Sequence, residues 1–189
     1  MNNLKNPRFL TISGIILFAA ISRIFPIAPN FQPILAIAIF AGYYLSDKKF
    51  SLLVPIVAML LSDLFIQLVS PVFFGYQTPG FHSMMPFVYF SMILSVLIGS
   101  KLIKKLNVFN VIGSSFVSAV MFFLITNFGS WFAFEMYTKD LSGLMMSYEM
   151  GLPFFRNSLV STLLYSGVLF GGFSLAEKYI KVLQPVTIK

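Results

Sequence analysis

Long apolar segments alternate with small basic clusters along this chain of 189 residues. A basic cluster lies at every second boundary between apolar segments. If the segments cross a membrane in alternating directions, all of these clusters fall on the same side. Ten of the 13 Lys and Arg residues form these clusters: Lys5, Arg8, Lys48, Lys49, Lys101, Lys104, Lys105, Lys178, Lys181 and Lys189. Lys and Arg beside membrane helices gather on the cytoplasmic side. The pattern therefore predicts a multi-pass membrane protein with both termini in the cytoplasm.

The composition agrees with this interpretation. Charged residues make up 10% of the chain, whereas soluble domains carry about 25%. Six spans of about 20 residues would use about 120 residues, which leaves short loops and no separate soluble domain. The net charge of +7 suits contact with anionic lipid headgroups. We therefore expect membrane lipid, and not nucleic acid, as a partner.

We expect an all-α integral membrane protein that forms a single domain over residues 1–189. The apolar segments predict six transmembrane helices, at residues 9–25, 31–45, 51–69, 84–99, 109–132 and 153–176. Ser51 is the predicted N-cap of the third helix, with Pro55 in its first turn. Pro153 is expected to open the sixth helix, so that residues 133–152 form an outer loop.

The residues that most enzymes need are missing from this sequence. The chain has no Cys and one His, which excludes disulfides, thiolate metal ligands and a zinc site built on two histidines. No glycine-rich phosphate loop is present. We therefore expect no enzymatic activity and no cofactor.

Several polar residues fall within the predicted spans, where an ionisable group costs a few kcal/mol and usually has a function. Asp63 and Asn127 each lie about six residues from the outer end of their span, or about 9 Å deep at about 1.5 Å per residue. Arg23 and Arg156 lie closer to the outer surface. Asp63 and Gln67 share a helix face because they are four residues apart. These positions predict a polar pocket that opens outward, with Asp63 and Asn127 at its floor.

Each of these residues also has a structural explanation that needs no ligand. Asp63 would form an ion pair with Arg23. Arg23 and Arg156 would otherwise extend their charged ends to the outer interface. Asn127 would hydrogen-bond between helices.

Two further candidates lie near the outer ends of the spans. Trp131, together with Tyr89, would stack on an apolar face of a ligand, or Trp131 would belong to the interfacial aromatic belt. His82 would act as a gate or bind a metal carried by the ligand, or it would be a solvated loop residue.

Five segments of the chain are distinctive, in this order: SRIFPIAPNFQP (22–33), LSDL (61–64), PFVY (86–89), FFLITNFGSW (122–131) and GLPFFRNSL (151–159). Together they resemble a family of small bacterial membrane proteins similar to the substrate-binding S components of energy-coupling-factor (ECF) vitamin transporters. Within those transporters, the chain resembles most closely the solitary vitamin B12 type.

This resemblance implies a six-helix protein of the bacterial cytoplasmic (inner) membrane that captures a vitamin or related cofactor, with cobalamin as the first candidate. It leaves open whether an energy-coupling ATPase module is a partner or the protein acts alone. His82 would bind the cobalt, since the chain has no cysteine. The residues expected to bind substrate are Arg23, Asn30, Asp63, Gln67, His82, Tyr89, Asn127, Trp131, Arg156 and Asn157.

Two other functions remain open at this point. The chain would be a proton-coupled or facilitative transporter of a small solute, centred on Asp63. Alternatively it would be a structural or assembly protein of the membrane, in which the polar groups serve helix packing.

Overall fold

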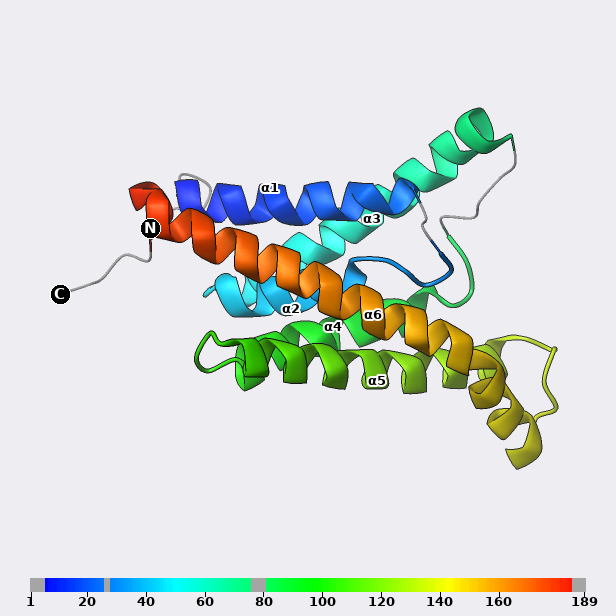
Figure 1. Ribbon diagram of the computed structural model, residues 1–189. Coiled ribbons are helices and arrows are strands. Elements are labelled where there is room, and N and C mark those ends of the chain that lie inside the picture. Colours follow the sequence, from blue (N-terminus) through cyan, green and yellow to red (C-terminus); the bar gives the residue numbers. More distant parts are fainter. Residues whose placement is uncertain (1–5, 26–27, 76–80, 185–189) are drawn as a thin grey trace.

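The computed structural model describes residues 6–25, 28–75 and 81–184, and these residues form an all-helical protein (Figure 1). Lys5 and Lys189, and residues 76–80 of the expected second outer loop, lie outside this part. The helices are α1 (Pro7–Ile21), η2 (Ser22–Ile24), α2 (Ile34–Tyr44), α3 (Lys48–Phe74), α4 (Met85–Leu102), α5 (Val108–Ala133), α6 (Leu141–Tyr179) and η3 (Lys181–Leu183).

Four of the helices are long and apolar enough to cross a membrane. They are the first 22 residues of α3 and the whole of α4, α5 and α6. Helices α1 and α2 are apolar but shorter, with 15 and 11 residues. The predicted all-α fold is therefore confirmed, with four helices that could span a membrane, whereas a crossing by all six helices stays a prediction.

Helix α2 forms the centre of the bundle. Every residue of α2 except Tyr43 is buried, because the helix contacts α3, α4 and α6 as well as α1 and α5. Phe40 anchors this core, and its ring meets those of Phe170 and Phe173 edge-on at centroid distances of 5.3 and 5.7 Å. A helix that is apolar on all sides, as α2 is, is the kind expected at a core.

Two glycines bring α2 and α4 into backbone contact. A Cβ atom on Gly42 would lie 2.1 Å from the carbonyl oxygen of Val96, and one on Gly99 would lie 2.2 Å from that of Ile39. Small residues at helix crossings allow this approach in membrane proteins. The central position of α2 therefore depends on the absence of side chains at these two sites.

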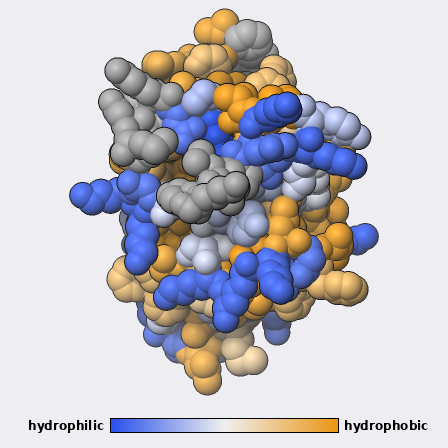
Figure 2. All heavy atoms as spheres, turned by 90° about the vertical axis from the view of Figure 1, so that its left-hand side faces the viewer, coloured by the Kyte–Doolittle hydropathy of each residue, from blue (hydrophilic) through white to orange (hydrophobic). Residues whose placement is uncertain are grey.

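Both ends of the described chain lie at the same end of the bundle, together with the α2–α3 and α4–α5 connections (Figure 1). Hydrophilic side chains gather over this face (Figure 2). Exposed lysines lie in the helix ends and connections of this face: Lys48, Lys49, Lys104, Lys105, Lys178 and Lys181. The basic clusters predicted from the sequence thus lie together on one end of the molecule.

One basic residue of this end has a structural role. Arg8 of α1 forms an ion pair with Glu177 of α6 at 2.5 Å. Its guanidinium also lies 5.7 Å from the ring centre of Tyr44 and 5.9 Å from that of Phe173. These contacts join α1 to α6 and α2 at this end of the bundle.

The expected outer loop at residues 133–152 is wrong over most of its length, because α6 begins at Leu141 and not at Pro153. The carboxylate of Asp140 accepts hydrogen bonds from the Gly143 N–H and the Thr138 hydroxyl. These bonds, the first more than the second, lower the pKa of Asp140, and the resulting anion suits a helix N-terminus. Ser147 and Tyr148 then donate to backbone carbonyls of α5, at Asn127 and Leu124.

The start of α3 also differs from expectation. Asp47, and not Ser51, is the N-cap, and its side chain accepts from the Lys49 N–H at 2.9 Å. Ser51 lies inside the helix and donates to the Lys48 carbonyl. At its other end α3 continues past Val69 to Phe74 and stops at Gly75, whose φ of 71° favours glycine.

We predict that Gly42→Ala and Gly99→Ala each destabilise the protein by about 1–3 kcal/mol or more, because the added Cβ collides with backbone. Thermal unfolding of the purified protein in detergent measures this change.

Gly113→Ala and Gly171→Ala are the matched controls, since a Cβ at either site meets no atom within 4 Å. They should keep the stability or raise it by up to about 1 kcal/mol, through better helix propensity. Equal losses in all four variants would contradict the close crossing of α2 and α4.

Candidate functional site

A buried ion pair joins the end of α1 to α3. The Nη1 of Arg23, in η2, lies 2.7 Å from Oδ1 of Asp63 in the middle of α3. The two side chains are 10% and 5% exposed. The same nitrogen donates to the Ser62 hydroxyl at 2.6 Å. Arg23 therefore turns into the protein, and the ion pair considered as the structural alternative is the observed arrangement.

Two neutral side chains complete this cluster. The Tyr89 hydroxyl of α4 donates to Oδ2 of Asp63 at 2.7 Å. Gln32, in the connector between η2 and α2, accepts from Nε of Arg23 through Oε1 at 3.1 Å. Both oxygens of Asp63 thus have a donor, and the cluster holds η2, the connector, α3 and α4 together.

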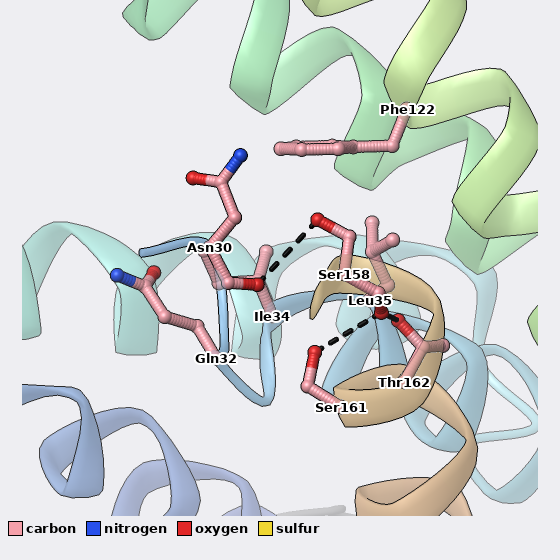
Figure 3. A pocket seen from close by; sticks show the side chains of 8 residues that line it. All are labelled: Asn30, Gln32, Ile34, Leu35, Phe122, Ser158, Ser161 and Thr162. Carbon is pink, nitrogen blue, oxygen red and sulfur yellow. Dashed lines mark hydrogen bonds between the residues drawn. The ribbon is translucent and has the colours of Figure 1, made fainter. Parts of the chain in front are cut away.

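A cavity lies on the other side of the connector, between α2, α5 and α6 (Figure 3). Its volume is about 20 Å³. Eight residues line it: Asn30 and Gln32 from the connector, Ile34 and Leu35 from α2, Phe122 from α5, and Ser158, Ser161 and Thr162 from α6. The ring of Phe122 extends over one side, facing the side chains of the connector and of α6 (Figure 3).

The cavity has polar groups among apolar ones, and no charged residue is among the described residues that line it. The hydroxyls of Ser161 and Thr162 both donate to the Ser158 carbonyl, at 3.0 and 2.6 Å. Their oxygens keep lone pairs that accept hydrogen bonds, and the amides of Asn30 and Gln32 supply donors. Since Arg23 and Asp63 neutralise each other nearby, the cavity is suited to an uncharged, hydrogen-bonding group.

Two hydrogen bonds hold the connector against α6. Nδ2 of Asn157 donates to the Pro29 carbonyl at 2.9 Å, and the Ser158 hydroxyl donates to the Asn30 carbonyl at 3.4 Å. Asn30 itself adopts a left-handed conformation with φ of 58°, which Asn tolerates better than most residues. These contacts close one wall of the cavity.

Asn127 belongs to a different contact, between α5 and α6. Its Nδ2 donates to the Phe123 carbonyl one turn earlier, and a Cβ on Gly151 would lie 2.2 Å from its Oδ1. Across the helices, its backbone carbonyl accepts from Ser147. The structure explains Asn127 by helix packing.

The remaining predicted residues lie toward the end of the bundle opposite the basic face. Trp131 donates through Nε1 to the Thr138 carbonyl at 2.8 Å, and it lies against Lys139, which donates to carbonyls at the C-terminal end of α5. His82 is exposed, and its Nδ1 accepts from the Met84 N–H just before α4. Arg156 is exposed and Gln67 is half-buried.

The structure thus divides the predicted site into separate groups. Arg23, Asp63 and Tyr89 come together. Asn30 lines the cavity, and Asn157 hydrogen-bonds to the connector that forms one of its walls. Sequence reasoning missed Gln32, Phe122 and the three hydroxyl residues of α6. Ser158 and Thr162 are four residues apart in an apolar helix, and such spacing places both hydroxyls on one face.

A protein-family model matches residues 3–183, and the chain therefore belongs to this family, DUF6580, a family of unknown function. No curated protein matches the chain. No solved structure matches it either.

We predict that Asp63→Leu destabilises the protein by about 3–5 kcal/mol, because it leaves the Arg23 guanidinium buried without its partner. The double variant Arg23→Met with Asp63→Leu should recover most of this loss, since replacing both charges by apolar groups is often neutral. Thermal unfolding in detergent measures both.

Tyr89→Phe is the control for the neutral partner and should cost about 1 kcal/mol, the usual contribution of one hydrogen bond. Additive losses in the double variant would show that the two charges do not stabilise each other.

Proposed function

We propose that this DUF6580 protein binds a small solute inside the membrane, in the manner of an S component. The observation that carries the proposal is the cavity between the connector, α2, α5 and α6, with neutral hydrogen-bonding groups on an apolar background. Binding sites for small molecules combine mostly apolar walls with a few placed polar groups. The segments at residues 22–33, 122–131 and 151–159 resemble those of S-component relatives. Four of the eight lining residues belong to these segments, namely Asn30, Gln32, Phe122 and Ser158, and this supports the same function.

The orientation follows from the basic end face. Lys and Arg gather on the cytoplasmic side, so the end with both termini faces the cytoplasm of a bacterial cell in this proposal. The connector between α1 and α2 lies toward the opposite end (Figure 1). The cavity then receives solute from outside. Crossing of the inner membrane by all six helices, with α1 and α2 as the short spans, belongs to the same proposal.

The size of the cavity limits how a ligand enters. A volume of about 20 Å³ holds about one water molecule, whereas pockets for drug-sized ligands measure about 300–1,000 Å³. A vitamin-sized ligand therefore requires the connector to leave α6, which breaks the hydrogen bonds from Asn157 and Ser158. Cobalamin remains the first candidate, with exposed His82 as the proposed cobalt ligand. Asp63, Gln67, Trp131 and Arg156 remain proposed contacts of such an opened site.

The proton-coupled alternative has less support. Both oxygens of Asp63 accept hydrogen bonds, and the carboxylate faces Arg23 at 2.7 Å. The carboxylate is therefore engaged in contacts within the protein. An energy-coupling ATPase module as partner, or transport by the protein alone, is the remaining choice within the proposal, and the basic end face is where such a module would dock.

A ligand that binds only the folded protein raises its stability, by about 2.7 kcal/mol at 100 times its dissociation constant. We therefore expect at least one member of a panel of cobalamin, smaller vitamins and small uncharged solutes to raise the unfolding temperature in detergent. Thr162→Val and Ser161→Ala should reduce the shift at a given concentration, because they remove hydroxyls from the cavity.

Thr11→Val is the matched control, since its hydroxyl also donates to the carbonyl four residues earlier but lies in α1, away from the cavity. A panel that leaves the wild-type unfolding temperature unchanged would overturn the proposed function. A shift that survives Thr162→Val and Ser161→Ala in full would move the site elsewhere.

A further inference from the structure

Closer to the basic end of the bundle than Phe122, α5 has two buried serines whose hydroxyls lack a hydrogen-bond partner among the described residues. Ser114 and Ser118 are 1% and 0% exposed. Their Oγ atoms have no hydrogen-bond partner among the described residues. A serine inside a helix ordinarily donates to the carbonyl one turn earlier, as Ser95 does to Ser91 at 2.9 Å. A buried hydroxyl without a partner needs an explanation, such as a water molecule or a ligand.

The register of α5 and α6 places Ser118 at the level of the cavity and Ser114 one turn nearer the basic end. The Ser115 and Ser166 hydroxyls lie 3.0 Å apart across the two helices, and Gly151 packs on Asn127 nearer the other end. The two helices run in opposite directions between these contacts. Ser118 therefore lies level with Thr162, which lines the cavity.

Phe122 is the residue of α5 that lines the cavity, and it lies one turn from Ser118 in the sequence. Ser114, Ser118 and Phe122 follow one another at intervals of four residues, so they share one face of α5. Side chains of a helix lean toward its N-terminus, which directs the Phe122 ring toward Ser118. The ring also lines the cavity (Figure 3). This geometry places the ring on the cavity side of Ser118.

We propose that the binding site continues inward past Phe122, and that the hydroxyls of Ser118 and Ser114 bind the inner end of the ligand when the ring moves aside. The side chains at the same levels of α5 and α6, Ser115, Ser166 and Thr162, are uncharged. An ion without a partner is strongly disfavoured in such surroundings. The inner end of the ligand is therefore a slim, uncharged group with both donors and acceptors, such as a hydroxylated or amide side arm. This inference rests on the cavity of the proposed function.

The chain contains no cysteine, so single cysteines report access without background. We expect Ser118→Cys and Ser114→Cys to react with iodoacetamide, a small uncharged reagent, at least about tenfold faster than Ser95→Cys, since the reaction needs a hydrated thiolate. Ser95 is equally buried but has its partner within α4. Ser142→Cys, at an exposed site, calibrates full access.

Phe122→Ala added to Ser118→Cys should raise the rate by a further factor of about ten, whereas Leu124→Ala, at an exposed position, should not. Each variant is used only if it unfolds cooperatively near the wild-type temperature, and the two serine positions serve as independent reporters.

Ser161→Cys separates this inference from the proposed function, because Ser161 lines the cavity itself. If Ser161→Cys reacts while Ser118→Cys and Ser114→Cys react no faster than Ser95→Cys, the inner site is overturned and the cavity stands. If Ser161→Cys is inert as well, both are overturned. Reaction at Ser118 that is unchanged by Phe122→Ala would overturn the role of the ring.

Discussion

The ion pair between Arg23 and Asp63 is the interaction on which the half of this protein opposite its basic end depends. Lipid offers no hydrogen bonds, so a polar group in a membrane helix must find its partners inside the protein. Arg23 meets Asp63, Ser62 and Gln32, and Asp63 also meets Tyr89. One guanidinium thereby places the connector between α1 and α2, whose other side forms a wall of the cavity.

The same requirement explains why the interior contains two kinds of helix contact. Glycine allows α2 and α4 to touch through their backbones at Gly42 and Gly99. Between α5 and α6, hydroxyls form the contact, as in the pair Ser115 and Ser166. Close packing excludes ligands from the first crossing, whereas the second offers hydrogen-bonding groups and leaves space beside them.

Sequence reasoning was most successful where one residue type acts through local rules. Apolar runs and basic clusters predicted an all-helical membrane protein and the gathering of lysines on one end. It failed at residues 133–152, where Asp140 starts a helix that Ser147 and Tyr148 fasten to α5. Asp140 is a good N-cap by type, but Pro153 was the stronger local signal, and only the contact with α5 shows that α6 starts earlier.

The predicted site shows the same limit. The polar residues Arg23, Asp63 and Asn127 were recognisable because ionisable and amide groups are costly in a span, yet their depth alone suggested one pocket. In the folded protein Asp63 belongs to a cluster of η2, α3 and α4, whereas Asn127 packs between α5 and α6. Hydroxyl residues such as Thr162 are common in helices, so nothing local marks them as cavity residues.

The sequence by itself determined that this protein is helical, resides in a membrane and has one basic end, because hydropathy and charge act at each residue independently of its partners. The tertiary structure decided which polar groups meet. It paired Arg23 with Asp63, and it left a cavity lined by Asn30, Gln32 and the hydroxyls of α6. Such pairings depend on the crossing and register of helices, which are set by packing across the whole bundle.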